Sequence, residues 1–187
     1  MRRMNLLQLV EKQEELNNLY VPGWRSALSP EHYLVQCIDE TAELLGSGTQ
    51  YKWWKDVPEE EYNEWNAKIE MVDILFFSSS IISLRTPEHL RHTLSTINLK
   101  NYDRSDLKVV MGGTNHLNHK NVSKLLSHLV TVTTSDKHCQ SYDVYGLISS
   151  IVGSMDFSPE ELSAIYAAKY ALNKFRISSG YKTGKYQ

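Results

Sequence analysis

Apolar residues recur at helical spacing along most of the chain, whereas the two-residue alternation typical of half-buried strands is scarce. This pattern predicts an all-α fold, a helical bundle. The predicted helices cover residues 4–20, 30–46, 59–84 or 62–84, 87–99, 121–134, 141–154 and 158–177. We expect a single domain over residues 1–187, with a helical insert at about 86–155 in which residues 100–121 form a loop.

The most informative segment is IEMVDILFF, residues 69–77, in which seven of nine residues are apolar. Glu70 and Asp73 lie inside this run, three residues apart, so both carboxylates project from one side of the predicted helix. The helix has no polar face at this point. We therefore expect the two acids to point into the protein.

A second acid pair with the same spacing, Glu40 and Glu43, lies on the preceding predicted helix. We expect Leu34, Ile38 and Leu45 to form the apolar face of that helix, with the two glutamates on its flank. If the two helices are neighbours in the bundle, one acid pair can face the other.

Four gathered carboxylates repel one another, and burying each of them costs free energy. A divalent cation resolves both problems, and Mg2+ prefers such hard oxygen ligands while keeping positions for water and phosphate oxygens. Two alternatives are solvated helix faces and ion pairs with the lysines or arginines of the chain. A di-iron site normally needs Glu-x-x-His, and neither pair has a histidine at that position.

The last predicted helix carries a stripe of cationic and amide side chains. Lys169, Asn173 and Arg176 fall at i, i+4 and i+7, a set suited to a phosphorylated ligand with a hydrogen-bonding edge. The tail that follows supplies glycines, lysines and tyrosines for a mobile lid: Gly180, Tyr181, Lys182, Gly184, Lys185 and Tyr186. The alternative is a solvated helix end with a cationic tail, which the helix dipole favours.

Composition narrows the function classes. A formal net charge of -2 and a pI near 6.4 argue against a general nucleic-acid binder. No stretch has the length of a membrane span or of a signal-peptide core, so we expect a soluble, cytoplasmic protein with no membrane partner. Cys37 and Cys139 have no metal-binding or redox spacing and are interpreted as core or incidental thiols.

The motifs in combination resemble those of the all-α, dimeric-type dUTPases of the all-α NTP pyrophosphatase superfamily. In chain order they are KQEELNN, ETAEL, YKWWK, EMVD and KYALNKFRISSGYKTGKY. The last matches the family pattern Lys-Asn-x-Leu-Asn-x-Phe-Arg followed by Gly-Tyr-x-x-Gly-x-Tyr, except that Tyr170 replaces the usual Asn. Tyr170 should leave the stripe and change local packing. Residues 86–155 match no motif of the family.

The resemblance implies a Mg2+-dependent homodimer that hydrolyses dUTP to dUMP and pyrophosphate. It implies Glu40 or Glu43 as the carboxylate that orients or deprotonates the attacking water. The implied metal ligands are Glu40, Glu43, Glu70 and Asp73, and the implied substrate-binding residues are Gln13, Asn17, Lys55, Lys169, Asn173, Arg176, Tyr181 and Lys182. Two alternatives are a relative that acts on dCTP or on both dCTP and dUTP, and a non-catalytic helical binding module.

Overall fold

The computed structural model describes residues 5–47, 63–97, 119–135, 141–153 and 157–180, and within these ranges it contains helices and no strands. The prediction of an all-α fold is therefore confirmed. The elements in chain order are α1 (Leu6–Tyr20), α2 (Trp24–Ala27), α3 (Pro30–Gly46), α4 (Glu64–Arg85), the 3-10 turn η1 (Glu88–Leu90), α5 (Arg91–Leu94), α7 (His119–Thr134), α8 (Ser141–Gly153) and α9 (Pro159–Ser178).

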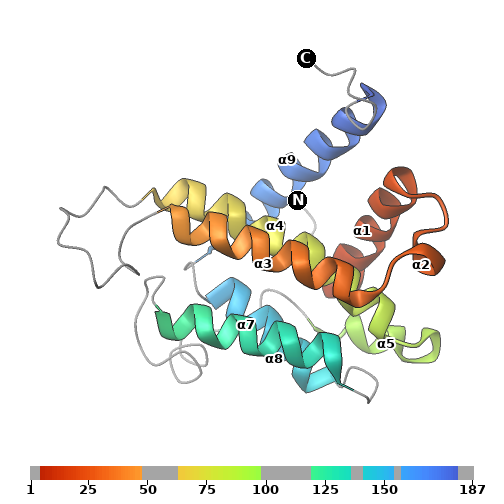
Figure 1. Ribbon diagram of the computed structural model, residues 1–187, viewed down its shortest axis with the longest axis horizontal. Coiled ribbons are helices and arrows are strands. Elements are labelled where there is room, and N and C mark those ends of the chain that lie inside the picture. The colour runs from red at the N-terminus through yellow and green to blue at the C-terminus, as the bar shows by residue number, and fades with distance from the viewer. Residues whose placement is uncertain (1–4, 48–62, 98–118, 136–140, 154–156, 181–187) are drawn as a thin grey trace.

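Helices α3 and α4 run side by side through the middle of the molecule (Figure 1). Helices α7 and α8 pack against each other and against this central pair on one side, whereas α1 and α9 contact α4 on the other. The buried apolar residues of all these helices form one continuous cluster. The description of residues 86–155 as an insert within a single domain stays a prediction.

Polar side chains fix where the long helices begin. Asn5 caps α1 through a reciprocal pair of 3.0 Å hydrogen bonds with Gln8, and Ser158 caps α9 in the same way with Glu161. These boxes satisfy backbone N–H groups that have no partner inside the helix. Asn63 caps α4, so this helix begins at Glu64, later than the predicted start at residue 59 or 62.

Helix α4 is buried on nearly every side, which agrees with the apolar run that predicted it. It also buries four serines, Ser78, Ser79, Ser80 and Ser83. A buried serine hydroxyl needs a partner, and Ser79 donates to the carbonyl of Leu75 at 2.8 Å. The small serine side chains leave room for neighbouring helices on a helix that is otherwise filled with large apolar residues.

The prediction for the apolar face of α3 is wrong. Its buried residues are Tyr33, Cys37, Thr41 and Leu44, whereas Ile38 is 49% exposed and Leu34 and Leu45 are only partly buried. Cys37 and Thr41 tolerate burial because their side chains bond to backbone carbonyls: Thr41 donates to Cys37 at 2.6 Å and the Cys37 thiol to Ile74 at 3.9 Å.

The predicted helix at 87–99 is only partly confirmed: among the described residues the segment forms η1, α5 and turns that continue to Ile97 instead of one continuous helix. Hydroxyls compete for the carbonyls here: Thr93 donates to Leu90 at 2.7 Å, Ser95 to His92 at 2.6 Å and Thr96 to Thr93 at 2.7 Å. Such local bonds favour tight turns over a continuous helix.

Glu14 ties α1 to the neighbouring elements. Its carboxylate accepts two hydrogen bonds from Arg91, at 2.7 and 3.0 Å, and further bonds from Arg25 and Ser83. Partial burial raises the pKa of Glu14, but the hydrogen bonds from Arg91 and Ser83 outweigh it and hold the pKa below its ordinary value. None of the described helices combines the length and the apolar character that crossing a membrane requires.

Candidate active site

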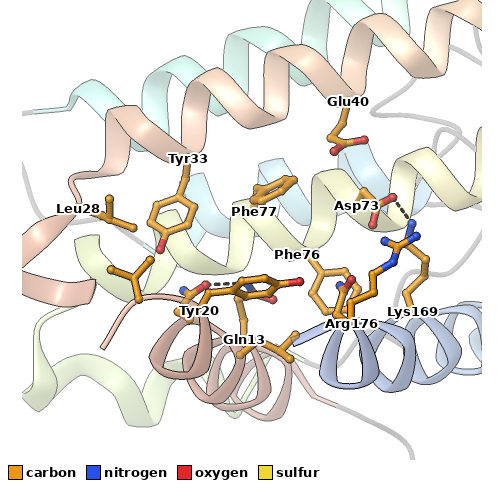
Figure 2. Close-up of a pocket in the computed structure, with 14 residues that line it drawn as sticks. Gln13, Tyr20, Leu28, Tyr33, Glu40, Asp73, Phe76, Phe77, Lys169 and Arg176 are labelled. Carbon is orange, nitrogen blue, oxygen red and sulfur yellow. Dashed lines mark hydrogen bonds and ion pairs between the residues drawn. The ribbon is translucent and has the colours of Figure 1, made fainter. Parts of the chain in front are cut away.

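A cavity of about 360 Å³ lies among α1, α3, α4 and α9. This volume lies in the range of small-molecule sites. Figure 2 shows charged side chains, among them Glu40, Asp73 and Arg176, at one end and Leu28 and Tyr33 toward the other. Seven residues singled out from the sequence line it: Gln13, Asn17, Glu40, Asp73, Lys169, Asn173 and Arg176.

The acid pairs of α3 and α4 meet beside the charged end. Carboxylate oxygens of Glu40, Glu43 and Glu70 all lie within 4.8 Å of one another, a spacing that could hold a metal ion. Burial, followed by the charges of Asp73, Glu43 and Glu70, raises the pKa of Glu40 to about 7. Burial, followed by the charge of Asp73, also raises the pKa of Glu70. The cluster therefore carries electrostatic stress that a bound cation would relieve.

Asp73 is not a member of this three-carboxylate cluster. It forms an ion pair with Lys169, whose side chain reaches it from α9. Burial nevertheless raises the pKa of Asp73, although the hydrogen bond and charge of Lys169 and the charge of Arg176 oppose this. The expectation that α4 directs its acids inward holds for Asp73, whose side chain is only 14% exposed.

The cation stripe predicted on α9 is present, since Lys169, Asn173 and Arg176 all line the cavity. The stripe therefore faces the carboxylates across the same space (Figure 2). Tyr170 lies off this stripe, as expected, and its hydroxyl donates to Glu15 on α1. Its ring also lies 4.5 Å from the Lys12 ammonium. The departure from the family pattern thus packs against α1 outside the cavity lining.

Three polar side chains form a hydrogen-bonded chain beside the cavity. Gln13 donates from Nε2 to Asn17 Oδ1 at 2.9 Å, and Asn17 donates from Nδ2 to Ser80 Oγ at 3.0 Å. Gln13 is only 5% exposed, and its Oε1 has no hydrogen-bond partner within the described part of the chain. Leaving a buried carbonyl oxygen unpaired costs free energy, so this atom is suited to accept a hydrogen bond from a ligand.

Sequence reasoning missed the walls of the cavity. Phe76 and Phe77 of α4 line it, together with Tyr33 of α3 and Leu28 before that helix. Phe76 also stacks on Tyr166 of α9, with ring centroids 4.4 Å apart. The apolar run ILFF indicated a buried segment, but its residue types do not distinguish residues that face the core from residues that face a cavity. Tyr33 was not predicted because the apolar pattern of α3 favours a different face as the buried one.

Three predicted substrate-binding residues, Lys55, Tyr181 and Lys182, lie outside the described residues, as do the YKWWK motif, Cys139 and all of the tail predicted as a lid except Gly180. Cys37 is a free, buried core thiol, as predicted.

Comparison with known proteins relates nearly the whole chain to one family. The sequence model of a family described as dUTPase matches residues 5–181 of the chain. The match thus includes every element that lines the cavity. No curated protein matches the chain.

Proposed function

The chain belongs to the all-α dUTPase family, and from this premise we propose that it is a Mg2+-dependent dUTP diphosphatase that hydrolyses dUTP to dUMP and pyrophosphate. One observation supports this most strongly: carboxylates, cations and buried amides surround a single cavity. Phosphates need the cations, a metal needs the carboxylates, and a base needs hydrogen-bonding amides between apolar walls.

The residues present fit a magnesium ion. The three clustered glutamates offer hard oxygen ligands within 4.8 Å of one another, and burial together with the neighbouring acids raises the pKa values of Glu40 and Glu70, so a cation would stabilise their charged forms. We propose Glu40, Glu43 and Glu70 as metal ligands and Asp73 as a fourth. The charge of Asp73 raises the pKa values of Glu40 and Glu70, so its carboxylate interacts with this cluster. A bound Mg2+ would neutralise charge that develops on the phosphate chain.

Lys169 and Arg176 are proposed to bind the phosphates. Both side chains line the cavity from α9, and the ion pair with Asp73 holds the Lys169 ammonium at the charged end of the cavity. Guanidinium and ammonium groups make short, charge-assisted hydrogen bonds to phosphate oxygens. Lys55, Tyr181 and Lys182 are part of the same proposal on the basis of the family pattern alone.

Glu40 is proposed to orient or deprotonate the attacking water, with Glu43 as the second candidate. Glu40 lines the cavity and also belongs to the acidic cluster, and this double membership supports its role in activating the water. A catalytic carboxylate must reach the water it activates, and position is the first criterion for this role.

Gln13, Asn17 and Asn173 are proposed to bind the base and the sugar. Gln13 and Asn17 are buried polar residues on α1, and Asn173 lines the same cavity from α9. The phenylalanine pair and Tyr33 supply apolar surface for the nucleoside.

Pyrophosphate release from dUTP, dCTP, dTTP and UTP, each with Mg2+ and with EDTA, tests this proposal. Turnover of dUTP alone that requires Mg2+ is the expected result. Equal turnover of dCTP would favour a broader pyrimidine pyrophosphatase, and no turnover of any nucleotide would favour a non-catalytic binding module.

We also propose that the protein is a cytoplasmic homodimer. Val35 and Ile38 of α3 are 61% and 49% exposed, an apolar surface that a second copy could cover. Light scattering after size-exclusion chromatography measures the mass, and a monomer at micromolar concentration would contradict the dimer.

A further inference from the structure

Ser80 lies at the inner end of the hydrogen-bonded chain that begins at Gln13, and its role in that chain is not apparent from the sequence. The residue is fully buried on α4. Its hydroxyl accepts from Asn17 Nδ2 at 3.0 Å and donates toward the carbonyl of Phe76 at 3.5 Å. A hydroxyl has one hydrogen, so donation to the backbone leaves only its lone pairs for Asn17.

The direction of the bond between Asn17 and Ser80 determines the orientation of the amide groups of Asn17 and Gln13. Because Asn17 must turn its Nδ2 toward Ser80, its Oδ1 faces Gln13 and accepts from Gln13 Nε2 at 2.9 Å. Gln13 must then present its other amide atom, Oε1, away from Asn17. That oxygen is the buried, unpaired acceptor described above.

We propose that Ser80 is a positioning residue for base selectivity: it sets the polarity of the Ser80–Asn17–Gln13 chain, so that the cavity presents an acceptor to the base. This inference rests on the proposed function. Uracil carries an N–H donor at N3, which pairs with such an acceptor, whereas cytosine carries a lone pair at the same position. Thymine has the same N3–H donor as uracil, so an acceptor at Gln13 distinguishes uracil from cytosine but not from thymine.

The opposite polarity shows why Ser80 matters. If Ser80 donated to Asn17 Oδ1, Asn17 Nδ2 would face Gln13 Oε1, and Gln13 would offer its Nε2 donor to the base. That arrangement suits cytosine. The helix carbonyl of Phe76 selects against it, because it competes for the single hydroxyl hydrogen of Ser80.

The test is the ratio of kcat/KM for dUTP to kcat/KM for dCTP in wild type, Ser80→Ala, Ser80→Thr and Ser79→Ala. Ser80→Ala removes the hydroxyl, lets both amides reverse and should lower the ratio about tenfold, the effect of one mispaired buried hydrogen bond. Ser80→Thr keeps the hydroxyl, so its ratio should stay close to the wild-type ratio. Ser79→Ala is the matched control, since Ser79 is equally buried on α4 and bonds only to the Leu75 carbonyl among the described residues.

The outcomes separate this inference from the proposed function. A wild-type enzyme that hydrolyses neither nucleotide overturns the proposed function, and with it the inference. A uracil preference that survives in Ser80→Ala within about twofold, or that falls equally in Ser79→Ala, overturns the inference alone. If Ser80→Ala does not fold, Ser80→Cys, whose thiol is a weak acceptor of similar size, should give an intermediate ratio, and an unchanged ratio would overturn the inference.

Discussion

Protonation of Glu40 should control magnesium binding in the absence of nucleotide. Burial and the neighbouring acids raise the pKa of Glu40 to about 7. With that pKa, about 9% of the Glu40 carboxyls are ionised at pH 6 and about 91% at pH 8. A metal ligand must be deprotonated, so the apparent dissociation constant for Mg2+ should be about tenfold larger at pH 6 than at pH 8.

Isothermal titration of Mg2+ into the nucleotide-free protein at pH 6, 7 and 8 measures this dependence. Binding at pH 6 should also release close to one proton, which repeats in buffers of different ionisation enthalpy reveal. Glu40→Gln should bind Mg2+ more weakly, with an affinity that varies little between these pH values. Asp39→Asn is the matched control, because Asp39 is an exposed carboxylate on the same helix, and it should retain the wild-type dependence.

Two results would refute this reasoning. An affinity that stays constant from pH 6 to pH 8 in the wild type would show that Glu40 does not compete with a proton for the metal. A pH dependence that persists unchanged in Glu40→Gln would assign the titration to a different group.

Three further substitutions test other parts of the site and the fold. Glu70→Gln removes one carboxylate of the cluster and should lower Mg2+-dependent turnover of dUTP about 100-fold or more; turnover near the wild-type rate would contradict the metal assignment. Lys169→Met removes a proposed phosphate ligand and leaves Asp73 without its ion pair, so kcat/KM for dUTP should fall about 100-fold, with partial recovery in Lys169→Arg; an unchanged kcat/KM would exclude Lys169 from phosphate binding. Glu14→Gln weakens the bonds to Arg91 and Arg25 and should lower the free energy of unfolding at pH 7 by about 1–3 kcal/mol in urea titrations. Because the folded-state pKa of Glu14 is lowered, its contribution is present above its unfolded pKa and lost as the pH falls through its folded pKa, so the two proteins should converge in acid; a constant difference would contradict this.

The parts of the site that could be predicted from the sequence are charged or polar residues at unusual positions, either inside an apolar run or together on one helical stripe. Glu70 and Asp73 stand out because carboxylates are costly in an apolar run. Lys169, Asn173 and Arg176 stand out because they share a helical stripe, and the structure brings all three to one cavity. Residue type and periodicity were sufficient for these predictions.

The parts of the fold that the sequence did not reveal depend on contacts and exposure that residue type does not encode. Thr41 is buried although it carries no strong apolar signal, because the backbone carbonyl of Cys37 accepts a hydrogen bond from its hydroxyl. Ile38 is exposed in the described chain although it is strongly apolar, so hydrophobicity alone did not separate the buried face of α3 from its exposed face. The link between Ser80 and Asn17 joins residues 63 positions apart, which no local pattern encodes.

Helix α4 carries residues at both ends of the site and therefore sets the distance and the rotation between those ends. Asp73 belongs to the charged end and Ser80 to the chain of amides, and the step of seven positions from one to the other makes about two helical turns, a rise of about 10 Å. Inserting or deleting one residue between them would rotate one end against the other by about 100° and shift it by about 1.5 Å. A substitution along this stretch acts at its own position, whereas a change in its length would misalign the two ends of the site at once.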